Sequence, residues 1–136
     1  MKTVTAAIAA AALLAAAGPA RATDLGEEVQ VTAGVVTGLG CALKAREKGD
    51  LKVLTACPPA EAGKEMVVFD VAERAIYRIA AKVVRRSQLE SAFGGGSIDF
   101  TGKAVKVDAK QDIATVEVKE FSVAKKPKAG AFKGCL

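Results

Sequence analysis

The stretch Ile98–Val123, IDFTGKAVKVDAKQDIATVEVKEFSV, decides the fold because its pattern is that of two β-strands joined by a polar turn. Apolar residues recur at every second position on both sides of the turn Asp108–Asp112, as Val116 and Val118 do after it. This alternation predicts a β-hairpin with one apolar and one charged face. An apolar hairpin face is not stable alone in water, so we expect further strands to cover it.

The second strand of this hairpin changes phase along its length. Phe121 and Val123 carry the apolar side on odd positions, whereas Val116 and Val118 carry it on even positions. One extra residue in a strand, a β-bulge, shifts the alternation in this way. We therefore predict a bulge or a sharp bend at Lys119–Glu120.

Upstream segments supply the strands that the hairpin requires. The segment Glu27–Leu39 alternates apolar and polar residues, and its glycines, Gly34 and Gly38, favour a long strand that bends from one sheet into the next. The segments Met66–Val71 and Ala75–Ala80 predict a second hairpin with a short turn between them.

A short helix is predicted between the third and fourth strands. Ser87 and Glu90 have the spacing of a capping box, and Gly94–Gly96 would end the helix. Leu89 and Phe93 lie on one side of it, where they could plug one end of a barrel. The fold class is therefore mainly β, an OB-like five-stranded barrel with one short capped helix between strands 3 and 4. A small β-sandwich is the alternative.

Residues 1–22 have the pattern of a secretory signal peptide. Lys2 gives a basic start, an apolar run rich in alanine follows, and Gly18–Ala22 contains a helix breaker and the small residues that a signal peptidase recognises. The apolar run is short for a membrane span. We expect cleavage after Ala22, a periplasmic or secreted protein, and no membrane-spanning segment after cleavage, with a retained anchor as the alternative.

The mature chain predicts one domain and a tail. Residues 23–124 form the OB-like β-barrel domain, with an irregular insert at 41–65 that has one helical turn at Leu51–Leu54. Residues 125–136 form a basic C-terminal tail. Of the 20 Lys and Arg residues, Lys2 and Arg21 belong to the leader, which leaves 18 against 15 acidic residues and a net charge of +3.

Three cysteines in an exported chain indicate one disulfide, because oxidising compartments preserve disulfides and a small barrel gains stability from a cross-link. We predict a bond between Cys41 and Cys57, which bracket the insert, since closing a loop of this length contributes about 3 kcal/mol. Cys135 would then be unpaired or would join two chains. A bond from Cys135 to either of the other cysteines is the alternative.

Cations gather at two places that could meet an anionic partner. One is the second hairpin, where two arginines flank a tyrosine that we expect on the surface, and the other is the tail, which contains no acidic residue. The residues of this candidate face are Arg74, Tyr77, Arg78, Lys125, Lys126, Lys128 and Lys133. The candidate partners are an acidic protein, a small ligand or an anionic envelope surface. For the tail, a solvated segment is the default interpretation and contact with an anionic partner is the alternative.

The residue sets of common catalytic and metal sites are missing from the sequence. There is no histidine to activate a serine, no G-x-S-x-G turn, and no close cysteine pair of the kind that zinc or thiol redox sites use. Gly94–Gly96 follows a helix and lacks the lysine of a phosphate-binding loop. We therefore predict no enzyme, no catalytic residue, no cofactor and no metal.

Several short motifs of the mature chain carry a resemblance to a known group of proteins. The motifs are Gly34–Val36, Cys41, Cys57, Phe93, Gly94 and Thr101–Lys103. Together they resemble small exported bacterial OB-like barrel proteins of uncharacterised function. Members of that group often carry an acidic residue after the paired valines and a histidine near the second cysteine, whereas this chain has Thr37 and no histidine. The resemblance therefore implies the fold and transfers no metal or haem role.

These observations lead to one expected function and its alternatives. We expect an exported, non-enzymatic binding or interaction module of the bacterial envelope, which contacts its partner with a barrel face or with the insert. The alternatives are a structural or stress-protective envelope protein without a small-molecule site, a single-stranded nucleic-acid binder, and a thiol redox factor. Nucleic acid is not the expected partner, because the chain has few aromatic residues to stack on bases.

Overall fold

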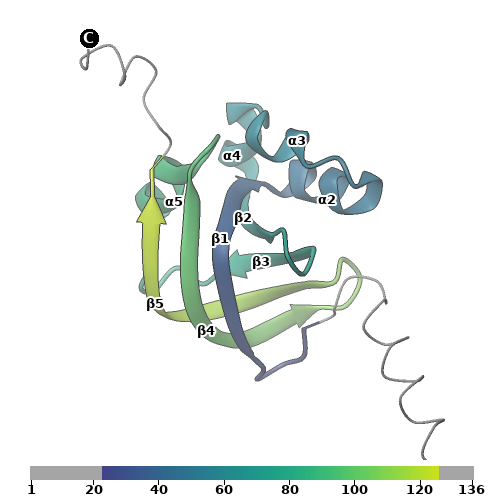
Figure 1. The fold of residues 1–136 in the computed structure, drawn as a ribbon. Helices are drawn as coiled ribbons and strands as arrows, with labels where there is room; N and C mark the ends of the chain where they lie inside the picture. The colour runs from purple at the N-terminus through teal and green to yellow at the C-terminus, as the bar shows by residue number, and fades with distance from the viewer. Residues whose placement is uncertain (1–22, 126–136) are drawn as a thin grey trace, which may run out of the picture.

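The computed structural model describes residues 23–125, in which five β-strands close into a barrel (Figure 1). The strands are β1 (Glu28–Gly38), β2 (Met66–Asp70), β3 (Ala75–Ile79), β4 (Ser97–Asp108) and β5 (Ile113–Ala124). Their order around the barrel is β1-β2-β3-β5-β4, and β4 pairs with β1 to close it. Neighbouring strands are antiparallel except β3 and β5, which are parallel. This is the predicted OB-like barrel, and the β-sandwich alternative is wrong.

The hairpin of β4 and β5 contains the bulge that the sequence predicts. Thr101 pairs with Glu120, but the next residue of β4, Gly102, pairs with Val118, so Lys119 is the extra residue. The bulge bends the hairpin around the barrel, as Figure 1 shows for both long strands.

A second bulge lies in β1, where the pairing with β4 shifts between Val31 and Gly34. Ala33 has a positive φ of 55°, and its backbone N–H donates to a carboxylate oxygen of Asp99 at 2.6 Å. A β-carbon on Gly34 would lie 2.5 Å from Val68 Cγ1. The strand therefore bends at Gly34, where the barrel interior leaves no room for a side chain.

Four helices complete the described part of the chain. They are α2 (Leu39–Lys48), α3 (Lys52–Thr55) and α4 (Pro59–Lys64) between β1 and β2, and α5 (Arg86–Ala92) between β3 and β4. The insert is thus more regular than the sequence predicts, since α3 alone corresponds to the expected helical turn. The inward side of α2 consists of Cys41, Ala42 and Ala45, and α4 buries no residue, so neither helix produces an apolar period in the sequence.

Helix α5 lies where the sequence predicts a helix, but it begins earlier. Its N-cap is Arg85, whose backbone N–H donates to the side-chain oxygen of Gln88 at 2.8 Å. The predicted capping box of Ser87 and Glu90 is wrong, because Glu90 forms an ion pair with Arg86 one turn earlier. Leu89 is buried in the barrel core, as expected of a plug at the barrel end.

The described residues form two apolar cores. The first fills the barrel. The second, which we call the outer core, lies between the insert and the outer face of the sheet and consists of Ala42, Ala45, Leu54, Val67, Phe69, Ile76 and Ile113. Strand β2 contributes to both cores, with Met66 and Val68 in the first and Val67 and Phe69 in the second, and its last residue, Asp70, is buried as well.

We predict that Gly102→Ala destabilises the barrel. A β-carbon at Gly102 would lie 2.4 Å from the backbone oxygen of Glu117 and 2.7 Å from Val116 Cγ1, and overpacking of this kind costs about 1–3 kcal/mol. Urea unfolding measures the change in the free energy of unfolding. Gly63→Ala is the matched control, because nothing lies within 4 Å of the added carbon and the position is helical. Equal unfolding midpoints for the two variants would contradict the tight packing of the backbone around Gly102.

Candidate functional site

The insert is held by the predicted disulfide. Cys41 in the first turn of α2 is bonded to Cys57, which directly precedes the two prolines at the start of α4, and their Cα atoms are 6.0 Å apart. Both cysteines are buried. The predicted pairing is therefore confirmed. Cys135 lies outside the described residues.

The cross-linked insert covers the outer face of β2 and β3. Leu54 of α3 is 1% exposed and belongs to the outer core with Phe69 and Ile76. The hydroxyl of Thr37 donates to the backbone oxygen of Leu54 at 2.9 Å, which ties α3 to the end of β1. In OB-fold proteins the face of strands 2 and 3 is the usual place for an oligonucleotide or oligosaccharide. Here the chain itself occupies that face.

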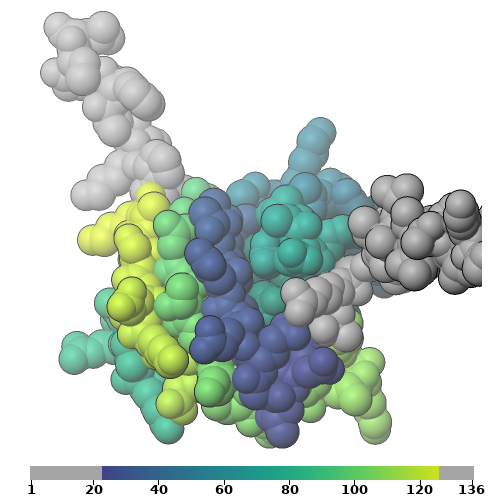
Figure 2. All heavy atoms as spheres, turned by 60° about the horizontal axis from the view of Figure 1, so that its bottom comes forward, coloured from purple at the N-terminus to yellow at the C-terminus, as the bar shows by residue number. Residues whose placement is uncertain are grey.

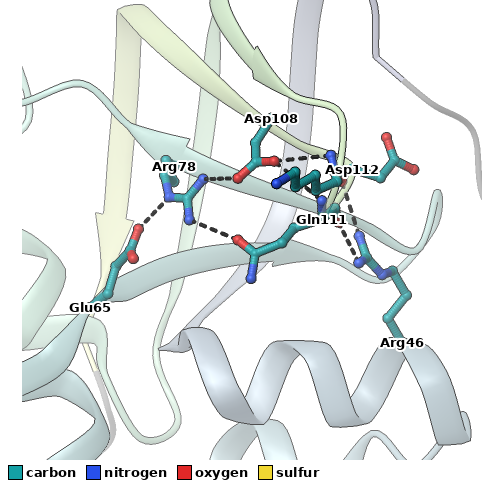
Figure 3. A network of polar contacts seen from close by, with 7 residues as sticks. Arg46, Glu65, Arg78, Asp108, Gln111 and Asp112 are labelled. Atoms are coloured by element: carbon teal, nitrogen blue, oxygen red, sulfur yellow. Dashed lines mark hydrogen bonds and ion pairs between the residues drawn. The ribbon is translucent and has the colours of Figure 1, made fainter.

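Helix α2 is also tied to the turn between β4 and β5 (Figure 3). The guanidinium of Arg46 donates to the backbone oxygens of Gln111 and Asp112, at 2.5 and 3.0 Å. Arg74 in the turn between β2 and β3 donates to the backbone oxygen of Arg46 at 2.7 Å. These contacts close the insert against the β4–β5 turn, the two loops that flank the usual binding face of the fold.

Arg78 of β3 lies at the centre of the same network (Figure 3). It forms an ion pair with Glu65, donates to the side-chain oxygen of Gln111 at 3.2 Å, and lies 3.7 Å from a carboxylate oxygen of Asp108. The Asp108 carboxylate in turn accepts the backbone N–H of Lys110 at 3.0 Å. The Arg78 charge is therefore compensated by acidic groups of the chain.

Tyr77 does not lie on the surface, so its predicted role as an exposed aromatic is wrong. Its side chain is 6% exposed and packs edge to face with Phe100, with ring centroids 6.1 Å apart. Because successive side chains of a strand point to opposite faces, Tyr77 enters the barrel while Arg78 points out of it. Burial raises the pKa of the Tyr77 hydroxyl, whose oxygen accepts the hydroxyl of Thr23 at 3.4 Å.

The remaining residues of the predicted cationic face are not brought together by the described contacts. Arg74 and Arg78 contact groups of the chain itself, and Lys125 is exposed after the end of β5. Lys126, Lys128 and Lys133 lie outside the described residues. A face for an anionic partner at these positions stays a prediction.

A hollow of about 390 Å³ lies between the end of α4, the end of β3 and α5, and we call it the α5 hollow. Its lining is apolar on the inside and charged at the rim. The lining residues are Lys64, Glu65, Met66, Arg78, Ile79, Ala81, Val84, Arg86, Leu89 and Thr115. Sequence reasoning missed this hollow because its lining comes from separate segments that only the barrel brings together.

Further hollows lie on other parts of the described surface. An open groove of about 340 Å³ runs over β1, β4 and β5, which lie side by side on the face that Figure 2 presents, and its polar lining includes Asp99, Glu120 and Ser122. A hollow of about 70 Å³ near Tyr77 is acidic, with Asp70 and Glu73 in its lining. Burial raises the pKa of the Asp70 carboxyl, although backbone N–H groups of Glu73 and Ala72 donate to it.

The described residues show neither a metal-binding cluster nor a membrane-spanning helix. Within residues 23–125, no three His, Cys, Asp or Glu side chains lie together in a way that could hold a metal ion. Over the same range, every helix is too short or too polar to cross a bilayer. A comparison of the chain with family models, curated proteins and solved structures finds no match.

We predict that removing the cross-link destabilises the domain without unfolding the barrel. Closing a loop of this length contributes about 3 kcal/mol, so the variant carrying Cys41→Ser and Cys57→Ser should lose about that much free energy of unfolding. Urea unfolding without reductant measures the loss. Cys135→Ser is the control and should match the wild type. Equal stability of the double variant and the wild type would contradict a structural role for the bond.

Proposed function

We propose that this protein is an exported, non-enzymatic binding module of the bacterial envelope that takes a small ligand in the α5 hollow. The observation that carries this proposal is the hollow itself, which combines an apolar interior with a few polar groups at its rim. Its volume lies within the range of about 300–1,000 Å³ that is typical of small-molecule sites.

The closed face of β2 and β3 supports the choice of this site. The disulfide and the contacts of Arg46 hold the insert over that face, so a ligand would have to displace a buried cluster to reach it. The groove over β1, β4 and β5 is more open, and most of its lining residues are polar; of its apolar residues, Val31 and Phe100 are buried and Phe121 is half-buried. Within residues 23–125, the α5 hollow is thus a place where a ligand could bury apolar surface without opening the fold.

Export is supported by the leader sequence and by the surroundings of Thr23. A disulfide suits an oxidising compartment. Cleavage after Ala22 would give Thr23 a positively charged amino group. Thr23 lines the small acidic hollow together with Asp70 and Glu73, whose carboxylates would attract that charge.

We predict that the mature protein begins at Thr23. Ala22 and Ala20, the first and third residues before the expected cut, are the small residues that a signal peptidase requires. Amino-terminal sequencing of the protein recovered from the envelope fraction or the medium tests this. Recovery of a chain that starts at Met1 would refute export through a cleaved leader.

We predict that a thermal-shift screen with small amphipathic compounds identifies stabilising ligands, because a ligand that binds the folded state raises the melting temperature. Ala81→Trp should abolish the shift, since Ala81 is exposed at the rim of the hollow and a large side chain there would fill it. Ala109→Trp is the matched control, because Ala109 is exposed in the β4–β5 turn and lies outside the lining. Shifts that survive in Ala81→Trp would place the ligand elsewhere. No shift with any compound would favour the structural or stress-protective alternative.

A further inference from the structure

The rim of the α5 hollow carries mostly positive charge. Lys64, Arg78 and Arg86 line it, and Glu65 is the one carboxylate in the lining. The interior is formed by side chains that are themselves nearly inaccessible to water, among them Val84 and Leu89. From this arrangement we infer that the hollow binds a small amphipathic anion, a free carboxylate with a short alkyl or aromatic body. The inference rests on the proposed function and names the ligand class of that site.

Two of the three cations are available for a ligand. Arg78 is engaged by Glu65, Asp108 and Gln111, so its role is to hold the wall of the hollow. Lys64 is different, because its side chain is 76% exposed and its Nζ atom is as far as 4.0 Å from Glu61.

Arg86 is the second available cation. It pairs with Glu90 at 2.9 Å, but both side chains are more than half exposed, and exposed ion pairs of this kind contribute little to stability. It also donates to the backbone oxygen of Ala62 at 2.8 Å, which keeps the guanidinium close to α4 and the rim. Turning one of its N–H groups toward a ligand therefore costs little.

The apolar interior of the hollow would bind the alkyl or aromatic body of the ligand. Met66, Val84 and Leu89 are each at most 8% exposed, and Ile79 is partly buried. Each methylene that leaves water on such a surface strengthens binding by roughly fourfold. A volume of about 390 Å³ holds about a dozen groups of the size of a water molecule, which corresponds to a carboxylate of eight to ten carbons.

The charge pattern favours a single negative charge over a polyanion. Glu65 stands at the same rim as the two available cations, so a second or third negative charge on the ligand would be repelled. A nucleotide would also place polar groups against the apolar interior, where they would lose hydrogen bonds to water. A membrane surface fits poorly as well, because a bilayer contact needs several exposed apolar side chains. Of the large apolar side chains exposed in residues 23–125, Val83 is the one next to the lining of the hollow.

The experiment is a calorimetric titration of the purified protein with a matched set of probes. Octanoate is the test ligand, octanol and octyltrimethylammonium share its chain without the negative charge, and acetate shares the charge without the chain. We expect octanoate to bind about tenfold more tightly than octanol, and the other two probes to bind more weakly than octanol. Hexanoate should bind about fifteenfold more weakly than octanoate, because two methylenes are lost.

Substitutions of single lysines and arginines test which residues bind the carboxylate of the ligand. Lys64→Gln and Arg86→Gln should each weaken octanoate binding by about threefold and leave octanol binding unchanged, because the two cations share the tenfold advantage of octanoate over octanol. Lys48→Gln is the matched control, since Lys48 is exposed at the end of α2 and outside the lining. Amide chemical-shift changes on addition of octanoate should centre on Val84 and Leu89 and spare Ser122 in the open groove.

The outcomes separate this inference from the proposed function. Equal affinities for octanoate and octanol, or no effect of Lys64→Gln and Arg86→Gln, would overturn the anion while leaving a binding module in place. No binding of any probe, together with an empty screen, would overturn both. If vesicles containing phosphatidylglycerol bound the protein through Lys64 and Arg86 while octanoate did not, the cations would belong to a membrane-surface contact and the inference would be wrong.

Discussion

Strand β2 has apolar side chains on both of its faces, and the rest of the structure follows from the need to cover both. Val68 points into the barrel, while Val67 and Phe69 point outward and would face water if the barrel stood alone. The insert between β1 and β2 supplies the cover with Leu54 and two alanines of α2. Small helices of this length are not stable by themselves, so the disulfide and the outer core have to hold them in place. The cross-link is therefore part of the fold.

Covering β2 in this way changes where the molecule can make contacts. The face of strands 2 and 3, which OB-fold proteins commonly use for ligands, is filled by the chain's own insert, and Arg46 fastens that insert to the β4–β5 turn. Among the described residues, the end of β3 stays open, where α4 and α5 leave a hollow with cations at its rim. Arg78 belongs to both regions, because its contacts with Glu65 and Gln111 join the wall of the hollow to the closed side.

The elements that sequence analysis predicted are those defined by local alternation. The hairpin of β4 and β5 and its bulge at Lys119 follow from period-two patterns, the hairpin of β2 and β3 follows from two short apolar runs around a turn, and the disulfide follows from loop closure. Tyr77 was placed wrongly because β3 has apolar residues on both faces, with Ile76 in the outer core, so alternation could not show which face meets water. The α5 hollow could not be predicted, since Lys64, Arg78 and Arg86 meet through the barrel closure and not through spacing in the sequence.

The claim on which the account depends is that the insert is packed on the outer face of β2 and β3 in solution. Nuclear Overhauser effects in the oxidised protein test it directly, through the methyl groups of Leu54 and the side chains of Val67, Phe69 and Ile76. The account predicts strong cross-peaks from the Leu54 methyls to this cluster, together with slow amide exchange in α2. Absence of these cross-peaks, with fast exchange throughout residues 41–57, would show an open face and contradict the account.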